Sequence, residues 1–263
     1  LPELLSSVFA VGLGSSHMAL GNIIGSNIYN IPLIIGICGL VGGGLQIKNA
    51  SINKECIFML GLSFMLVMML AVFQQVTWWM GAIFVAFYPL FIYHSIKNGT
   101  CTAEENCSEN QPSKKSISID ILLGAAALVI ATFVMVNSAI TISTIFGLDQ
   151  FFVGLTVLAL GCVVPEVAVS VAATLAGEED ITIGNVIGDN MLTLTLVFGT
   201  VGLTSQFTVS LSEILYTAPF MIIATLMLFT MNRLGHNVNK TWGVMMLATA
   251  GVAFIFQTSV SII

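Results

Sequence analysis

The sequence has few charged side chains, and this scarcity limits what the protein can be. Only 8% of its 263 residues are Asp, Glu, Lys or Arg, whereas soluble domains carry about 25%. So few charges cannot cover a surface that faces water, which excludes a globular enzyme in water. Lys and Arg number seven, against thirteen Asp and Glu. The basic patches that a nucleic-acid partner requires are therefore missing as well.

Histidine and cysteine are also rare, with three and five copies. The histidines lie at the ends of apolar segments, and no Cys–His spacing resembles a zinc site. Cys101 and Cys107 fall in a polar stretch that is assigned below to the cytoplasm, where thiols stay reduced. We therefore expect no soft-metal centre, no disulfide framework and no bound cofactor.

Long apolar segments are what the sequence does contain. A helix of about 20 apolar residues crosses a hydrocarbon layer of about 30 Å, and most of these segments are long enough. The first is shorter and starts at Leu1-Pro2-Glu3 without the features of a signal peptide, so we expect it to begin part-way along a helix. The sequence predicts an all-α, multi-pass membrane protein of about nine helices. They span residues 1–13, 18–43, 54–74, 77–96, 118–146, 150–176, 180–203, 210–232 and 240–262.

All basic residues fall in three of the predicted connections, 44–53, 97–117 and 233–239, when residues at the span edges are counted with them. They are Lys48, Lys54, Lys97, Lys114, Lys115, Arg233 and Lys240. An even number of predicted helices separates each pair of these connections, so all seven residues share one side of the membrane. The positive-inside rule makes that side cytoplasmic. The longest polar stretch, 97–117, is interpreted as a solvated cytoplasmic linker; regulatory ion binding by Glu104, Glu105 and Glu109 is the alternative.

The chain contains an internal repeat. A shift of 163 positions aligns Pro2-Glu3 with Pro165-Glu166 and Gly21-Asn22 with Gly184-Asn185, and also pairs identical residues at Ser7, Gly14, Ile24-Gly25, Asn27, Gly36 and Gly39. Five predicted helices separate the copies, and an odd number means that the copies run in opposite directions. Secondary transporters are commonly built from such inverted repeats, with the ion site where the repeats meet. The polar stretch 97–117 separates the first half, 1–96, from the second, 118–263.

Three carboxylates lie inside predicted spans: Glu3, Glu166 and Asp189. Each costs about 2.5–3.5 kcal/mol at a helix centre on the insertion scale. Lys54 and Lys240 lie only at span edges and no Lys or Arg lies deeper within a span, so a bound cation, a bound proton or water must compensate the charge. The other ten acids are predicted in connections or at span ends, at the edge of the water.

Oxygen-bearing side chains accompany these carboxylates on one helix face in each copy. They are Asn22, Ser26 and Asn30 in the first copy, and Asn185, Asp189 and Thr193 in the second. Ca²⁺ binds 6–8 oxygen ligands of these kinds, so the inventory predicts a hard-cation site. For Asn22 and Asn185 taken singly, helix–helix packing is the favoured alternative.

The two motifs resemble the α-repeats of the sodium/calcium exchanger family, within the cation/calcium antiporter superfamily. Pro2-Glu3 followed by Gly21 to Asn30, and Pro165-Glu166 followed by Gly184 to Asn190, carry the resemblance. It implies two five-helix halves, the first without its first helix and part of its second. It also implies Ca²⁺ extrusion against Na⁺ entry by alternating access, with 118–146 and the missing helix as the pair that slides.

The resemblance also implies roles for the residues of this sequence that match the family's motifs. The resemblance makes Glu3 and Glu166 the central ligands and places Ser26 and Asn30 beside the sodium sites. Two departures stand out: Asp189 occupies a position that is usually Ser, with Thr193 where Asp or Asn usually lies, and Cys162-Val163 replace the usual Thr-Ser. The carboxylate is thus displaced by one helical turn, about 5–6 Å. Val163 cannot ligate through its side chain, which predicts a weakened sodium site.

The predicted function is therefore a Ca²⁺ antiporter, Na⁺-coupled by resemblance, that works in a lipid bilayer. Two transport alternatives remain open: a Ca²⁺/H⁺ exchanger in which a carboxylate such as Asp189 trades a proton for the cation, and a passive cation channel. An intramembrane aspartyl protease needs two Asp in one site, and the Asp residues other than Asp189, which are Asp120, Asp149 and Asp180, lie at span ends, so an enzyme is not expected. The oligomeric state is left open.

Overall fold

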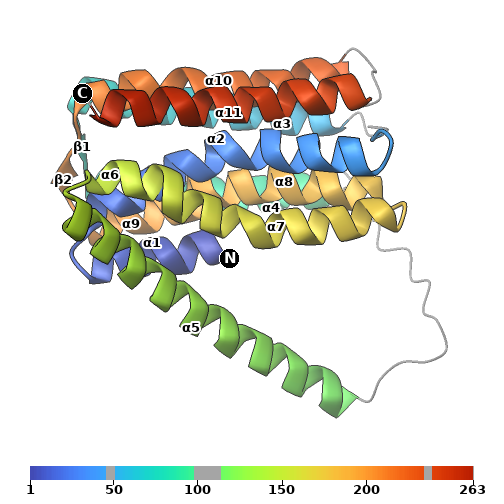
Figure 1. The fold of residues 1–263 in the computed structure, drawn as a ribbon, viewed down its shortest axis with the longest axis horizontal. Coiled ribbons are helices and arrows are strands. Elements are labelled where there is room, and N and C mark those ends of the chain that lie inside the picture. The colour runs from blue at the N-terminus through green and yellow to red at the C-terminus, as the bar shows by residue number, and fades with distance from the viewer. Residues whose placement is uncertain (46–50, 98–113, 234–238, 263) are drawn as a thin grey trace.

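The computed structural model describes residues 1–45, 51–97, 114–233 and 239–262, which form nine helical rods (Figure 1). All nine coincide with the apolar segments of the sequence, which confirms the all-α membrane architecture. Seven rods have the length and hydropathy of a membrane span, whereas α1 and the apolar part of α4 are shorter. Seven rods keep one helix type: α1 (Pro2–Gly12), α2 (Ser16–Val41), α3 (Ser51–Phe73), α4 (Trp78–Lys97), α5 (Lys114–Phe146), α10 (Leu211–Arg233) and α11 (Lys240–Ile262).

The two remaining rods change helix type part-way. One consists of α6 (Gln150–Val153), the π-helical segment η1 (Gly154–Leu158) and α7 (Ala159–Leu175); the other consists of α8 (Glu179–Leu192), the π-helical segment η2 (Thr193–Val197) and α9 (Phe198–Thr204). A threonine hydroxyl inside each π-helical segment donates to a carbonyl four residues earlier, over 2.8 Å from Thr156 and 2.6 Å from Thr195. Pro32, which aligns with Thr195 in the repeat, removes an N–H from α2 instead. Both copies therefore interrupt the regular helix at the same place.

Close backbone contact holds α2 against η1 at the centre of the bundle. A Cβ added to Gly21 would lie 2.1 Å from the Phe151 carbonyl oxygen, and one added to Gly25 would lie 2.3 Å from that of Leu155. Gly154 meets the Met18 carbonyl oxygen at 2.1 Å in the same way. Small residues permit this approach, which is typical of helix packing in membranes. The two copies of the repeat are thereby packed backbone to backbone.

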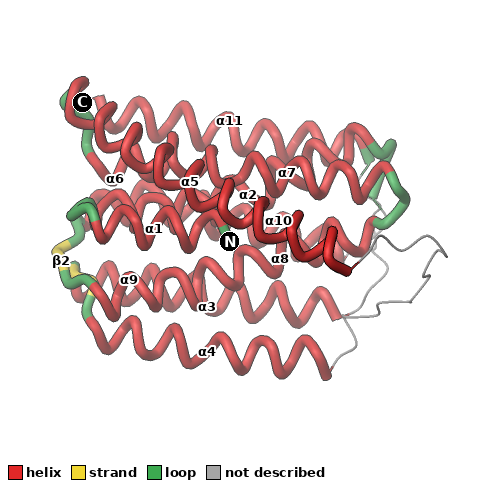
Figure 2. The backbone as a smooth tube through the Cα atoms, turned by 90° about the horizontal axis from the view of Figure 1, so that it is seen from below, coloured by secondary structure: helices red, strands yellow, loops and turns green. Residues whose placement is uncertain are grey.

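Two short strands, absent from the predicted all-α fold, connect one end of the bundle. Strand β1 (Gln75–Val76) follows α3 and pairs antiparallel with β2 (Phe207–Thr208), which precedes α10 (Figure 1). The opposite end carries the start of α3, the end of α4, the start of α5 and the end of α10 (Figure 1). Helix α5 diverges from the other rods towards its start (Figures 1 and 2).

One acid differs from its predicted surroundings. Glu55, expected at the edge of the water, is 6% exposed near the start of α3, and its Oε1 has no hydrogen-bond partner within the described ranges. Helix α3 packs mainly against α10, and hydropathy alone does not reveal which of its residues the bundle buries. Glu104, Glu105 and Glu109, proposed as regulatory ligands, lie outside the described residues, as do Cys101 and Cys107.

Candidate cation-binding site

The three carboxylates predicted from the sequence converge in the structure. One oxygen each from Glu3 on α1, Glu166 on α7 and Asp189 on α8 lies within 4.8 Å of the others. Glu3 is fully buried, Asp189 is 8% exposed, and Glu166 is half-buried. Three like charges this close repel one another strongly when they are shielded from water, so the arrangement favours a cation or protons among them.

The first copy leaves the Glu3 carboxylate available. Neither of its oxygens accepts a hydrogen bond in the described part of the chain; the Leu1 ammonium group, where this sequence starts, lies 3.6 Å from Oε2. The amide of Asn22 donates instead to the hydroxyls of Ser6 (2.9 Å) and Ser7 (3.1 Å). Asn22 thus ties α2 to α1, as the helix-packing interpretation expects, without touching the carboxylate of Glu3.

The second copy repeats this arrangement with one difference. The amide of Asn185 donates to the Ser170 hydroxyl at 3.0 Å, and Ser170 aligns with Ser7 in the repeat. The Asn185 amide also donates to Glu166 Oε2, at 3.1 Å. The internal repeat pairs Ser7 with Ser170 without indicating a role for either; their register with Asn22 and Asn185 is the sequence signal that points to one.

Asn30 joins the two copies directly. Its side-chain amide donates to Asp189 Oδ2 and, over 3.1 Å, to Asn190 Oδ1. These bonds bring α2 of the first copy against α8 of the second, so the displaced carboxylate of Asp189 lies within the site and not beside it.

Several buried oxygens of the predicted ligand residues and of Asn22 accept no hydrogen bond from any described residue. They are both carboxylate oxygens of Glu3, Asn22 Oδ1, Ser26 Oγ, Asn30 Oδ1 and Thr193 Oγ1. A buried polar atom without a partner costs about 1–3 kcal/mol. Hard cations take carboxylate, amide and hydroxyl oxygens as ligands, so a bound cation would satisfy atoms of this kind together. The donor set therefore fits Ca²⁺ or Na⁺, and holds no imidazole or thiolate among the three acids.

Comparison with known proteins places the chain in a family. The family described as sodium/calcium exchanger protein matches residues 1–97 and 119–259, which is most of the chain. The chain belongs to the sodium/calcium exchanger family. As a member of this family it is a multi-pass integral membrane protein and a cation/calcium antiporter, a transporter and not an enzyme.

Two relatives and one solved structure are similar to this exchanger over most of its length. The putative antiporter CaxA of Alkalimonas amylolytica is 28% identical over 98% of this chain and 84% of the relative. The sodium/calcium exchanger MaX1 of Methanosarcina acetivorans is 26% identical over 97% of this chain and 84% of the length of MaX1. The solved sodium-calcium exchanger NCX_Mj, soaked with Na⁺ and Sr²⁺, shares the fold with a TM-score of 0.72 at 23% identity, covering 97% of this chain and 81% of that one.

Two residues that depart from the family motif lie buried in the exchanger, one turn before Glu166. Cys162 is fully buried, with its Sγ 3.3 Å from the Ser6 hydroxyl, and Val163 is 1% exposed. Cys162 therefore contacts the first copy through the same serine that engages Asn22. Val163 places methyl groups where the family motif has a hydroxyl.

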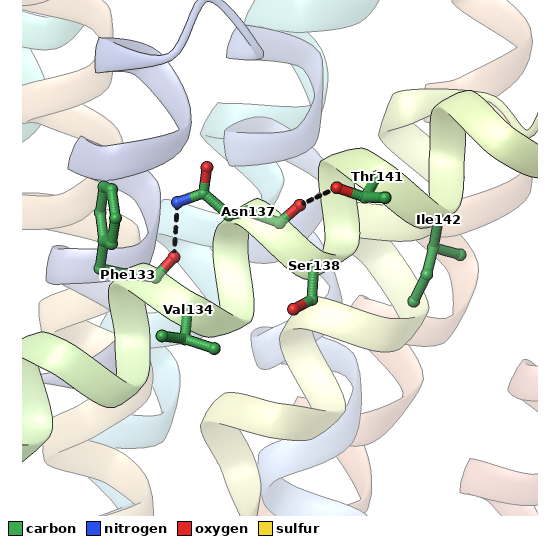
Figure 3. A pocket seen from close by; sticks show the side chains of 6 residues that line it. All are labelled: Phe133, Val134, Asn137, Ser138, Thr141 and Ile142. Carbon is green, nitrogen blue, oxygen red and sulfur yellow. Dashed lines mark hydrogen bonds between the residues drawn. The ribbon is translucent and has the colours of Figure 1, made fainter.

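A groove on α5 of the exchanger lies apart from these carboxylates (Figure 3). Its volume is about 390 Å³ and its lining is Phe133, Val134, Asn137, Ser138, Thr141 and Ile142. The Asn137 amide donates to the Phe133 carbonyl and the Thr141 hydroxyl to the Asn137 carbonyl, both over 2.8 Å. These polar groups are satisfied by their own helix, and no carboxylate lines the groove, so it does not resemble a cation site.

Proposed function

We propose that this exchanger carries Ca²⁺ across the membrane by alternating access, with Na⁺ as the coupling ion. The ligands are Glu3, Glu166, Asp189, Ser26, Asn30 and Thr193. The observation that carries the proposal is the meeting of three carboxylates from both copies, within 4.8 Å of one another, beside buried oxygens that lack donors in the described ranges. A hard cation supplies the positive charge that no Lys or Arg of the spans provides.

The charge of the site supports exchange between different cations. Three ionised carboxylates carry three negative charges, and one Ca²⁺ balances two of them. The third charge then requires a monovalent cation or a proton, because an uncompensated charge away from water is expensive. Several Na⁺ ions balance the same carboxylates when Ca²⁺ leaves. The relative MaX1 is named a sodium/calcium exchanger, which favours Na⁺ for this role.

The orientation follows from the basic residues. We place the end of the bundle that carries the termini of α3, α4, α5 and α10 in the cytoplasm, together with segment 97–117 between the halves 1–96 and 118–263. Support comes from the described helix ends, because Lys54, Lys97, Arg233 and Lys240 belong to helices that begin or end there (Figure 1).

A Ca²⁺/H⁺ exchanger is the second candidate. Asp189 favours it, because this carboxylate lies within 4.8 Å of two others and is 8% exposed. A proton on one of the three acids removes one of the repelling charges. In this mechanism Asp189 binds a proton whenever Ca²⁺ leaves.

Vesicles distinguish these candidates. The purified full-length protein is reconstituted, the vesicles are loaded with ⁴⁵Ca²⁺, and efflux is measured under an imposed Na⁺ gradient at equal pH on both sides, with choline as the control cation. We expect Na⁺ to accelerate efflux severalfold and a pH gradient without Na⁺ to leave it unchanged. Efflux driven by the pH gradient alone would establish proton coupling instead. Efflux in choline with no gradient of either ion would identify a passive channel.

A further inference from the structure

A line of hydrogen bonds joins α7 to α8 beyond Glu166. We call it the α7–α8 seam; its residues are Ser170, Thr174, Thr182 and Asn185. The Asn185 amide donates to Ser170 Oγ at 3.0 Å, the Thr182 hydroxyl donates to the Ser170 carbonyl at 3.0 Å, and the hydroxyls of Thr174 and Thr182 lie 2.9 Å apart. Ser170 and Thr182 are fully buried, and Thr174 is 6% exposed.

The direction of each bond in the seam is fixed by the number of protons available. A threonine hydroxyl has one proton to donate. Thr182 gives its proton to the Ser170 carbonyl, so the proton between Thr174 and Thr182 comes from Thr174. At the other end, the side-chain amide of Asn185 donates to Ser170 and to Glu166 Oε2. The two threonines therefore hold the Ser170 backbone against α8, the Ser170 hydroxyl accepts from the Asn185 amide, and this amide holds one carboxylate oxygen of Glu166.

The first copy of the repeat has no such seam. Val11 and Ala19 occupy the positions that align with Thr174 and Thr182, and neither carries a hydroxyl. The Asn22 amide reaches Ser6 and Ser7, and the carboxylate oxygens of Glu3 accept no hydrogen bond from the described residues. The hydroxyls of Thr174 and Thr182 are thus not needed to fold a copy of this repeat. They occur only where the neighbouring glutamate is tethered.

We propose that Thr182 and Thr174 are positioning residues that hold Glu166, through Ser170 and Asn185, in the orientation that binds the cation. This inference rests on the proposed role of Glu166 as a ligand. Residues in the second layer around a metal orient its ligands, and their loss typically lowers metal affinity by about 10–100-fold. The seam performs this function for Glu166, whereas Glu3 adjusts without a tether to the ion that is bound.

The test removes one hydroxyl while keeping the shape of the side chain. Thr182→Val should raise the KM for Ca²⁺ by about tenfold and leave the maximal rate within about twofold. The substitution weakens Ca²⁺ binding equally in the ground state and in the transition state, so only the KM changes. Thr182→Ser restores the hydroxyl and should return the KM to the wild-type value. The matched control is Thr225→Val on α10: Thr225 is 2% exposed, and among the described residues its hydroxyl bonds only to its own helix. It should leave the KM unchanged.

Other outcomes overturn the inference. An unchanged KM in Thr182→Val, an equal shift in Thr225→Val, or failure of Thr182→Ser to restore the KM would each refute the positioning role. If Thr182→Val does not fold, Thr174→Val takes its place, and an unchanged KM there also refutes it. Equilibrium binding of ⁴⁵Ca²⁺ to the same purified variants separates this inference from the proposed function. If the wild-type protein binds Ca²⁺ but shows no Na⁺-driven transport, the proposed Na⁺ coupling is wrong, and the Ca²⁺ affinities of the variants still test the positioning role. If the wild-type protein binds no Ca²⁺, the proposed function and the positioning role are both refuted.

Discussion

The contact between Gly25 and η1 supports a quantitative prediction. Gly25→Ala introduces a Cβ that lies 2.3 Å from the Leu155 carbonyl oxygen and 2.6 Å from the Cβ of Ala159. Ordinary van der Waals contact begins at 3.4 Å, so α2 must move away from η1 by about 1 Å. Because the neighbours are backbone and an alanine, no flexible side chain can absorb this displacement.

The displacement affects transport more than stability. Overpacking costs about 1–3 kcal/mol, and the better helix propensity of Ala returns about 0.5–1 kcal/mol of that. The free energy of unfolding should therefore fall by about 1–2 kcal/mol. Ser26 and Asn30 move with α2, away from the acids of the second copy. A misplacement of about 1 Å in a site can lower the rate by about 100-fold, and we expect a loss of this order in Na⁺-driven Ca²⁺ efflux.

Gly61→Ala on α3 is the control, because a Cβ there meets no atom within 4 Å. It should transport like the wild type and gain up to about 1 kcal/mol in stability. Both variants are reconstituted at equal amounts of monodisperse protein, and thermal unfolding is measured on the same preparations. Equally fast transport by Gly25→Ala and Gly61→Ala would show that the close contact between α2 and η1 at Gly25 does not position the site.

Three further substitutions test the ligands. Glu166→Gln should abolish Ca²⁺ efflux while the protein elutes and unfolds like the wild type, since no buried ion pair is broken; retained efflux would contradict its role as a ligand. Asp189→Ser combined with Thr193→Asp restores the usual family arrangement and should keep part of the activity, because the two positions lie one turn apart on one face of α8 and η2; an inactive double variant would show that the displaced carboxylate is not equivalent. Val163→Ser should steepen the dependence of efflux on Na⁺, and an unchanged response would show that the missing hydroxyl does not weaken a sodium site.

The helices were predictable because a bilayer leaves the backbone little choice. Apolar segments must satisfy their own N–H and C=O groups, so each apolar run in the sequence becomes a helix. The convergence of Glu3, Glu166 and Asp189 was also foreseeable, since an inverted repeat with a carboxylate in each copy brings those carboxylates to the shared interface. The helices depend on the composition of each segment alone, and the meeting of the carboxylates depends on a motif that is duplicated in the two copies of the repeat.

Features that depend on the packing of distant segments were not predictable. The hydroxyl of Tyr29 donates to Gln257 over 2.6 Å, and both side chains are buried, although 228 positions separate them. The different partners of Asn22 and Asn185 depend on Ser6, whose aligned counterpart is Val169. The π-helical segments η1 and η2 have no hydropathy signal, because a shift of one hydrogen bond leaves the apolar pattern intact.

The pairing of β1 with β2 closes a ring. Residues 1–96 contain β1 and residues 118–263 contain β2, so these two parts are linked through the chain at one end of the bundle and through the sheet at the other (Figure 1). A hinge motion that separates the two parts at the sheet end must therefore break the pairing of Gln75 with Thr208 and of Val76 with Phe207. A helix that lies outside the fastened core can travel along it and leave the ring intact, and α5, which diverges from the bundle, is placed to do so.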